Sequence, residues 1–368
     1  MELVFRADAS LEMGTGHVMR CLTLAQALRQ RGAHCRFICR MLPGNLIDFI
    51  RGRGFEVHAL PVEQQAHENG EPPLLGHAAW LGTDWKTDAD VTRDALGARV
   101  VDWLIVDHYA LDARWERQLR PACRRLMVID DLADRSHDCD VLLDQNLGRD
   151  AEDYAALVPQ HCTCLAGPHY ALLRPEFAEL REYSLRRREA PVLKQILISM
   201  GGVDKDNATS KVLEALRDVS LPQGCRIMVI MGAQAPWLEQ VRALAASLSC
   251  PTEVRVNIDD MAQVMADSDL AIGAAGSTSW ERCCLGLPAI VLVLAENQIE
   301  SSKALQVDGL AVVVPSATAS QAALTEAFTS GLRDIRASYP DISLKCAATC
   351  DGRGTQRLTE ILEIPHDH

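Results

Sequence analysis

The chain has 368 residues, of which 48% are hydrophobic and 24% charged, so its composition is that of a globular protein and excludes a disordered or fibrous one. With 37 basic and 50 acidic residues the formal net charge is −13, which argues against general binding to nucleic acid or anionic membranes. At about 100–200 residues per domain, the length predicts two domains, each with its own core.

Neither a membrane span nor an export signal is predicted. The longest apolar run covers residues 284–295 and is interrupted by Gly286 and Pro288, whereas a helix that crosses a bilayer needs about 20 residues. The N-terminus lacks a basic segment followed by an apolar one. Thirteen scattered cysteines without paired C-x-x-C spacings favour free thiols in a reducing compartment. We therefore expect a cytoplasmic protein without a bound metal.

In the first half of the chain, short apolar runs alternate with stretches of helical spacing. Strands are predicted at 3–5, 35–39, 55–60, 103–107, 126–129 and 141–143, and amphipathic helices at 18–30, 45–51 and 114–124. This alternation indicates parallel strands joined by right-handed crossovers. Residues 61–86, rich in Glu, Gly, Pro and His, are predicted to form an exposed excursion.

The pattern loosens after residue 166. Residues 168–190 are interpreted as a connection between two domains, in which the basic run 186–188 forms a solvated helix end. A second alternation follows, with strands at 195–199, 226–231, 253–256, 270–272, 289–294 and 311–314, and helices at 208–217, 237–247, 261–267 and 278–285.

The two alternations predict an α/β fold with two doubly wound, Rossmann-like domains that face each other across a cleft. The first domain covers residues 1–167 and the second covers 191–368, with the last helix free to pack back on the first domain. In such sheets, ligands bind beyond the carboxyl ends of the strands.

A glycine turn between the first strand and the first helix is the most distinctive feature of the N-terminal half. Gly14 and Gly16 would let the backbone approach a ligand, and the amides at the helix start favour an anion or a polar oxygen. His17 would lie in the first helical turn, where the helix dipole favours a neutral imidazole that can accept a proton. Alternatively, His17 caps the helix or packs beneath the turn. The full G-x-G-x-x-G dinucleotide fingerprint is absent.

A second glycine-rich turn, residues 273–281, has the chemistry of a phosphate cradle. Gly276 leaves room for a ligand, Ser277 and Thr278 supply hydroxyls, and Glu281 could accept two hydroxyl protons from a ribose. The alternative is an ordinary helix N-cap in which Glu281 is the capping-box partner.

Other polar or flexible residues also follow predicted strands. Gly201 and Gly202 form a third turn that could approach a phosphate, and Asn297 could contact sugar hydroxyls. The adjacent carboxylates Asp130 and Asp131 suggest a divalent metal, but the sequence offers no third ligand beside them, so capping or surface roles are favoured.

Several motifs follow one another along the chain, and their joint order identifies a protein family more specifically than any single motif does. They are residues 6–10 with 14–21, 107–109 with 115–116, 129–135, 167–174, 199–204, 273–281 and 297–298. Together they resemble the pseudaminic-acid-pathway hydrolases of UDP-2,4-diacetamido-2,4,6-trideoxy-β-L-altropyranose, over nearly the whole chain except residues 61–86. That family is similar in fold to the inverting, two-domain (GT-B) nucleotide-sugar glycosyltransferases.

The resemblance implies hydrolysis at the anomeric carbon with inversion, which would give UDP and the free sugar for pseudaminic acid biosynthesis and flagellin glycosylation. No metal or other cofactor would be needed. The catalytic residue would be His17, as the base that deprotonates the attacking water. The partners would be the UDP-sugar and water, with no nucleic acid and no membrane, and the protein would be a monomer or a weak oligomer.

The resemblance also implies the residues that bind the substrate. Gly276, Ser277 and Thr278 would hold the diphosphate and Glu281 the ribose, while Arg174 would help the leaving group depart. The other predicted substrate-binding residues are Asp8, Gly16, Tyr109, Gly201, Gly202, Ile258, Met261 and Asn297. Of these, Ile258 and Met261 would contact uracil, and Asp8, Tyr109 and Asn297 would position the water or the sugar.

Other function classes stay open. An inverting UDP-sugar glycosyltransferase could use the same donor site and would be favoured by an exposed apolar or basic patch around residues 11–13. A non-catalytic nucleotide-sugar-binding protein would not need His17. A metal-dependent pyrophosphatase would release UMP rather than UDP.

Overall fold

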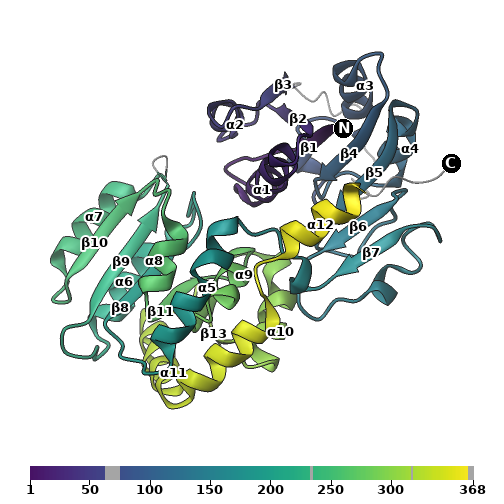
Figure 1. Ribbon diagram of the computed structural model, residues 1–368. Helices are drawn as coiled ribbons and strands as arrows, with labels where there is room; N and C mark the ends of the chain where they lie inside the picture. The colour runs from purple at the N-terminus through teal and green to yellow at the C-terminus, as the bar shows by residue number, and fades with distance from the viewer. Residues whose placement is uncertain (63–74, 233–234, 316–317, 364–368) are drawn as a thin grey trace. The chain divides into compact units, whose positions relative to one another are not determined.

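The computed structural model describes residues 1–62, 75–232, 235–315 and 318–363. The chain divides into two compact units, one of Met1–Leu172 together with the segment from Thr355 onward, and one of Leu173–Gly354. Each unit contains one parallel sheet with helices on both faces (Figure 1). The predicted fold class, two doubly wound α/β domains, is therefore confirmed.

The first unit contains a seven-stranded sheet of order β3-β2-β1-β4-β5-β6-β7, with every pair parallel. Its strands are β1 (Glu2–Ala7), β2 (His34–Arg40), β3 (Glu56–Leu60), β4 (Val101–Asp107), β5 (Cys123–Ile129), β6 (Val141–Asp144) and β7 (Thr163–Ala166). Its helices are α1 (Gly16–Gln30), α2 (Ile47–Gly52), α3 (Trp85–Leu96), α4 (Ala113–Leu119) and α12 (Gly354–Glu363). Short 3₁₀ turns are η1 (Ala78–Leu81), η2 (Arg120–Ala122), η3 (Ala151–Tyr154) and η4 (Pro168–Tyr170).

Both faces of this sheet are buried, which explains why its strands are apolar without alternation. Leu3 and Phe5 of β1 pack into a cluster with α1, α2 and α12. Val4, between them, points into the opposite cluster, which contains residues of α3 and α4. In the sequence, these strands are accordingly marked by short continuous apolar runs rather than by alternating apolar and polar residues.

The structure corrects two predictions in the first unit. The helix predicted at 114–124 ends at Leu119, because Pro121 interrupts it and β5 begins at Cys123. The excursion predicted at 61–86 contains η1 and the start of α3, and Leu81 within it is 1% exposed. Residues 63–74 of that segment lie outside the described residues.

The second unit contains a six-stranded parallel sheet of order β10-β9-β8-β11-β12-β13. Its strands are β8 (Gln195–Ser199), β9 (Arg226–Met231), β10 (Thr252–Val256), β11 (Leu270–Ala274), β12 (Ala289–Leu292) and β13 (Ala311–Val314). Its helices are α5 (Pro175–Arg188), α6 (Ala208–Arg217), α7 (Leu238–Ser247), α8 (Met261–Asp267), α9 (Thr278–Cys284), α10 (Ile299–Val307) and α11 (Gln321–Thr349), with the 3₁₀ turn η5 (Glu296–Gln298).

The segment 168–190, predicted as a connection, instead contains η4 and the 14-residue helix α5. Arg186 is exposed as predicted, but the other two arginines of the basic run are packed against the second unit. Arg188 is 3% exposed and donates to the carbonyls of Met265 and Ser268, while Arg187 pairs with Asp269 at 2.9 Å. These contacts attach α5 to the end of α8, so Arg187 and Arg188 are packing residues.

Each sheet has one point at which the strand order reverses, and the glycine turns lie there. In the first unit it falls between β1 and β4, and in the second between β8 and β11. Crossovers leave in opposite directions from such a pair, so the loops at its carboxyl end diverge and leave space for a ligand. The two switch points therefore identify where each unit can bind a ligand.

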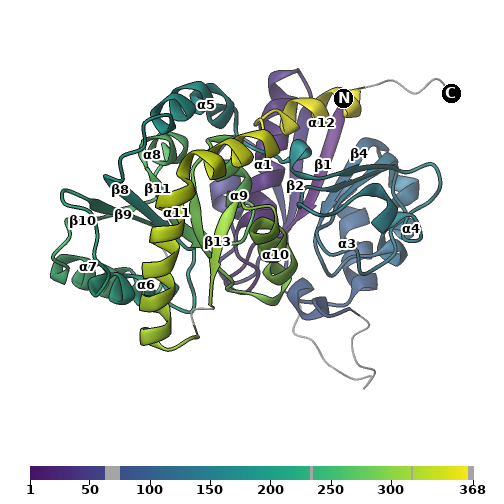
Figure 2. The same ribbon diagram turned by 90° about the horizontal axis from the view of Figure 1, so that it is seen from below.

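Helix α12 follows the long helix α11 and packs on the face of the first sheet that α1 covers (Figure 2). Leu358 and Leu362 are at most 1% exposed, and the Trp103 indole donates to the carbonyl of Leu362 at 3.1 Å. The last described turn of the chain is thus part of the core of the first unit. No helix within the described ranges combines the length and the apolar character needed to cross a bilayer.

Replacing Leu358 by Ala removes a fully buried side chain from this core. We expect the free energy of unfolding of the first unit to fall by about 2–5 kcal/mol, measured by urea denaturation. Glu360→Ala on the exposed face of the same helix is the matched control and should change it by less than about 0.5 kcal/mol. Equal effects of the two changes would contradict the burial of α12.

Candidate active site

The side chain of His17 pairs with a buried carboxylate at the first switch point. His17 is the second residue of α1, and Asp107 ends β4, in register with Ala7 of β1. His17 Nδ1 lies 2.5 Å from Asp107 Oδ1, and the two side chains are 7% and 0% exposed. A carboxylate that accepts a hydrogen bond from Nδ1–H leaves Nε2 with its lone pair. This arrangement gives His17 the geometry of a general base rather than of a helix cap.

Arg20, one turn further along α1, fixes the same carboxylate. Its Nε and Nη2 donate to the two oxygens of Asp107 at 2.6 and 2.7 Å, and Nη2 also lies 2.7 Å from Asp131. Burial alone would raise the pKa of Asp107, but Arg20 and His17 outweigh it and hold that pKa well below its usual range. Asp107 is therefore ionised at neutral pH and can accept from the imidazole.

Tyr109 borders His17 with its ring. The two rings meet edge to face at 4.6 Å, and the phenol donates to Asp131 Oδ2 at 2.6 Å. Burial and the neighbouring Asp131 raise the pKa of Tyr109 well above its ordinary value. Since its hydroxyl is committed to Asp131, Tyr109 can shape the site with its ring rather than by donating to a ligand.

Asp8 lies beneath the site and not on its surface. Its carboxylate is fully buried, accepts from the backbone N–H of Arg40 at 2.6 Å and pairs with Arg6 at 2.7 Å. His108 approaches it at 3.5 Å, and burial lowers the pKa of that imidazole to about 3. The carboxylate of Asp8 is therefore paired within the protein, and the substrate contact predicted for it stays a prediction.

The adjacent Asp130 and Asp131 are both committed to protein partners. Asp130 accepts from the backbone of Leu132 and Ala133 and pairs with Arg135 at 2.8 Å. The bonds of Asp130 close a turn after β5, where no helix begins, so it is not a helix cap, and the residue is fully buried rather than at the surface. Among the described residues, no group of three or more His, Cys, Asp or Glu side chains is arranged to hold a metal ion.

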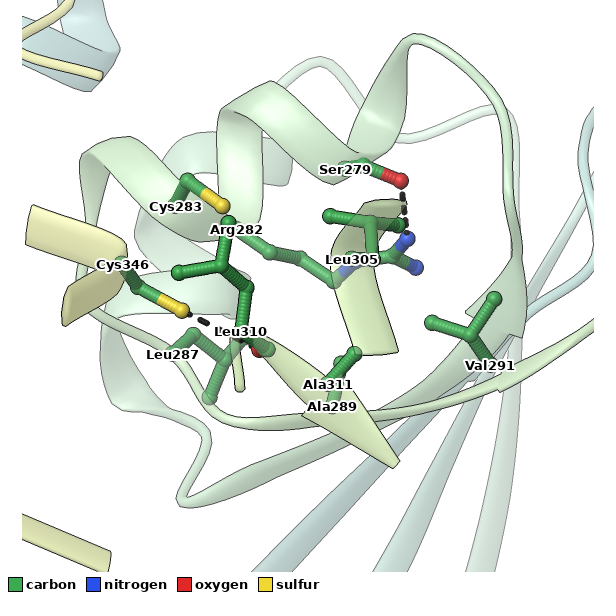
Figure 3. Close-up of a pocket in the computed structure, with 10 residues that line it drawn as sticks. All are labelled: Ser279, Arg282, Cys283, Leu287, Ala289, Val291, Leu305, Leu310, Ala311 and Cys346. Atoms are coloured by element: carbon green, nitrogen blue, oxygen red, sulfur yellow. Dashed lines mark hydrogen bonds between the residues drawn. The ribbon is translucent and has the colours of Figure 1, made fainter. Parts of the chain in front are cut away.

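In the second unit, the turn between β11 and α9 depends on Gly273. A Cβ at Gly273 would lie 2.5 Å from Arg282 Nη1 and 2.8 Å from the carbonyl oxygen of Ser199 on the neighbouring strand. Arg282 donates to the carbonyl of Ala274 and to Ser279 Oγ at 2.9 and 2.8 Å. Figure 3 shows this guanidinium reaching Ser279 above an apolar interior space. Arg282 thus supports the turn from within the core, away from any ligand.

The outer side of this turn is open. A Cβ at Gly276 would meet no atom within 4 Å, so the backbone there can be approached closely. Ser277 is exposed and stands at the N-cap position of α9, yet its side chain caps no helix N–H. The capping-box alternative is therefore wrong, and the amides of the first turn of α9 have no side-chain cap.

Arg174 and Glu281 come near one another from different elements of the second unit. Arg174 precedes α5, where its guanidinium lies over the Phe177 ring at 5.4 Å, and Glu281 is in the first turn of α9. Burial raises the pKa of Glu281, and the positive charge of Arg174 opposes that shift. Arg174 and Glu281 therefore interact electrostatically, and Glu281 lies in the first turn of the helix that follows the open glycine turn.

The remaining predicted residues follow other strands. Gly16 has open space where a Cβ would lie, and Gly201 is exposed with φ +93°. The carbonyl of Gly202 lies so close to Gly232 that residue 232 could not carry a Cβ. Ile258 and Met261, both half-buried, follow β10. The side chain of Asn297 lies outside the described part of the chain.

Sequence reasoning gave no role to four residues of the first site. Asp107 and Arg20 fix the imidazole of His17, and His77 and Trp80 of the segment at η1 contact Tyr109. The spacing of His17 and Arg20 on one helix face was an available signal. No sequence signal indicated that residues 77–80 pack against Tyr109, because this contact depends on tertiary packing.

Comparison with known proteins places these sites in context. Residues 196–346, within the second unit, match the glycosyltransferase family 28 C-terminal domain. Over 302 residues the chain is 26% identical to the UDP-2,4-diacetamido-2,4,6-trideoxy-β-L-altropyranose hydrolase of Campylobacter jejuni, covering 81% of this chain and 93% of that relative. The resemblance inferred from the motifs is thereby confirmed.

Two further similarities concern length and fold. The chain is 27% identical over 304 residues to the uncharacterized protein MJ1062 of Methanocaldococcus jannaschii, covering 82% of this chain but only 57% of that relative. The chain therefore spans little more than half of that protein. The crystal structure of Acinetobacter baumannii MurG superposes with a TM-score of 0.67 at 17% identity, covering 98% and 99% of the two chains. The fold is GT-B-like, and a nucleotide-sugar-related role fits these similarities.

The low pKa of Asp107 makes part of the stability depend on pH. An unfolded Asp carboxyl titrates near about pH 3.9, and in the folded protein the Asp107 pKa is lower. Its stabilising contribution is therefore present above the unfolded value and is lost as the pH falls toward the folded one. Between about pH 5 and 3, Asp107→Asn should reduce the slope of unfolding free energy against pH by up to about 1.4 kcal/mol per pH unit.

Chemical denaturation at a series of pH values measures this slope. Asp48→Asn is the control, because the Asp48 side chain is 97% exposed and pairs only with Arg51 across one helical turn. An unchanged slope in Asp107→Asn would mean that Asp107 titrates alike in the folded and unfolded chain.

Proposed function

We propose that this chain hydrolyses UDP-2,4-diacetamido-2,4,6-trideoxy-β-L-altropyranose at the anomeric C–O bond with inversion, giving UDP and the free sugar for pseudaminic acid synthesis. The observation that carries the proposal is the pair of His17 and the buried, ionised Asp107 at the first switch point. The similarity to the Campylobacter jejuni hydrolase supports the substrate, and the family 28 match supports nucleotide-sugar binding by the second unit.

In this mechanism the first unit activates water. His17 Nε2 removes a proton from the water as its oxygen bonds to the anomeric carbon on the face opposite UDP. Asp107 accepts from Nδ1–H throughout and stabilises the imidazolium that forms. The electron pair of the breaking C–O bond stays on the β-phosphate oxygen, and the proton on His17 later passes to solvent.

The second unit holds the leaving group. The amides around Gly276, Ser277 and Thr278 face the diphosphate, and Arg174 offsets the charge that develops as UDP departs. Glu281 accepts from the ribose hydroxyls. Ile258 and Met261 give an apolar contact for uracil.

A UDP-sugar glycosyltransferase is the second candidate. The family 28 match supports it, and Leu11, beside the glycine turn of the first unit, is 44% exposed. A transferase would use the same donor site but would direct His17 at an acceptor hydroxyl in place of water.

The first experiment measures UDP release from the diacetamido-trideoxy-altrose nucleotide in EDTA and H₂¹⁸O. We expect turnover with ¹⁸O in the free sugar and none in UDP, because water attacks carbon rather than phosphorus. His17→Ala should lower kcat by at least about 10²-fold through loss of the base. His34→Ala, at the opposite strand end of the same sheet and exposed, should retain wild-type activity.

Other results would redirect the assignment. UMP in place of UDP would indicate a pyrophosphatase, and faster UDP release on adding a sugar or lipid-linked acceptor would indicate a transferase. Wild-type kcat in His17→Ala would remove His17 from the mechanism. Binding of the nucleotide sugar without turnover would leave a binding protein.

The role of Glu281 is tested with UDP and 2′-deoxy-UDP as ligands. Glu281→Gln keeps the shape of the side chain but removes its charge, so UDP should bind about 10-fold more weakly by calorimetry. The preference for ribose over deoxyribose should fall with it. Glu239→Gln, whose side chain is 83% exposed on α7, is the control. A variant that keeps the full ribose preference would show that Glu281 does not contact the ribose.

A further inference from the structure

Residues 61–86, which the family motifs leave unmatched, include a turn that packs against Tyr109, the neighbour of His17. This 3₁₀ turn, η1, brings His77 and Trp80 against Tyr109, with ring-centroid distances of 5.3 and 5.9 Å. The Trp80 and Tyr109 rings are nearly parallel, at 28°, and His77 packs edge-on against Trp80 at 4.6 Å. The same Tyr109 ring touches His17 at 4.6 Å. These four rings, His17, Tyr109, His77 and Trp80, form a continuous aromatic wall.

The wall is fixed in place from below. Leu81, next to Trp80, is 1% exposed and packs into the cluster shared with α3 and α4. Gly82 ends the turn with φ +69°, and a Cβ there would lie 3.0 Å from Leu42. In the middle of the wall, the Tyr109 hydroxyl is bound to Asp131 at 2.6 Å. The rings are therefore held by the core of the first unit.

Trp80 and His77 nevertheless keep part of their surface exposed. Both are half-buried, whereas Leu81 beside them is fully covered. An indole that packs on a fixed tyrosine and keeps part of its surface exposed is suited to bind an apolar group. The sugar expected next to His17 carries three methyl groups, two from its acetamido substituents and one at C6.

We propose that Trp80, supported by His77, forms an apolar subsite for the methyl groups of the sugar and selects N-acetylated, 6-deoxy sugars over hydroxylated ones. The inference rests on the proposed function. A methyl group on the indole leaves water, whereas a hydroxyl in the same place would lose its hydrogen bonds to water without replacement. Discrimination between substrates that differ by such a group is about 10-fold or more.

The test compares Trp80→Ala with wild type on the diacetamido-trideoxy-altrose nucleotide and on UDP-N-acetylglucosamine, which has one acetamido group and a hydroxymethyl at C5. Trp80→Ala should raise KM for the first substrate about 10-fold and reduce the selectivity between the two by a similar factor. The affinity for UDP alone should be unchanged. Trp80→Phe keeps an aromatic face and should stay within about 3-fold of wild type.

Trp85→Ala is the matched control. Trp85 comes from the same segment and is also half-buried, but its ring lies under the Arg114 guanidinium at 5.1 Å rather than against Tyr109. The Trp85→Ala change should lower the stability of the protein without changing its KM or its selectivity between the two substrates. If Trp85→Ala moved both as much as Trp80→Ala does, the effect would come from folding, and the subsite would be refuted.

The two proposals can fail separately. If wild type hydrolyses the nucleotide but Trp80→Ala keeps its KM and selectivity, the subsite is wrong and the hydrolase stands. If wild type does not turn over, calorimetry compares binding of the intact nucleotide sugar with binding of UDP. If wild type binds the nucleotide sugar more tightly than UDP and Trp80→Ala does not, the subsite is supported without hydrolysis. If both proteins gain the same affinity from the sugar, the subsite is overturned.

Discussion

The carboxylate of Asp107 is the group on which the first unit's site depends. It is fully buried at the end of β4 and is shared between His17 and Arg20, which approach from the same face of α1. A buried charge is tolerated only when it is paired and hydrogen-bonded, and here each oxygen has such partners. The same contacts that satisfy the charge also fix the orientation of the imidazole. Stability and chemistry are therefore joined in one interaction.

Below that pair, a second buried network stiffens the strand ends. Asp88 of α3 binds Arg6 of β1 and Arg40 of β2, each at 2.7 Å. Burial would raise the pKa of Asp88, but the two guanidinium groups hold it well below the usual range. Asp8 pairs with Arg6 and accepts from the backbone N–H of Arg40, and His108 approaches Asp8, so the strand ends that precede His17 and Tyr109 rest on a buried polar layer. The glycine turn of the second unit is supported differently, by one buried arginine beneath backbone carbonyls.

The segment at 75–86 is part of the packed first unit rather than a surface loop. It contains η1, which brings the rings of His77 and Trp80 against Tyr109, and it leads into the first residues of α3. Asp88, supplied by α3, is also part of the polar layer. This part of the chain thus reaches into the core of the first unit through Leu81 and, within α3, Ala89, although the sequence predicted an exposed excursion at 61–86.

The local pattern alone determined most strands and helices, because hydrophobic periodicity is a property of neighbouring residues. Strands β8, β9 and β13 and helices α6 and α8 have the predicted bounds. The glycine turns were also recognisable, as was His17 at a helix start. Sequence reasoning did not predict β7, which has only four residues, or the helices α3, α5, α10 and α11. In α5, Arg187 and Arg188 pack while Arg186 faces solvent.

Only the tertiary structure decided which of these motifs meet. Residues 7 and 107 become neighbours because β4 pairs with β1 rather than with β3, which precedes it in the chain, and no local pattern encodes that order. The same pairing buries Asp107 beside His17 and Arg20 and fixes the orientation of the imidazole. Likewise, the contact of Trp80 with Tyr109 follows from the packing of η1 against the sheet. The sequence determined the elements and the chemical groups, and long-range burial decided the site they form.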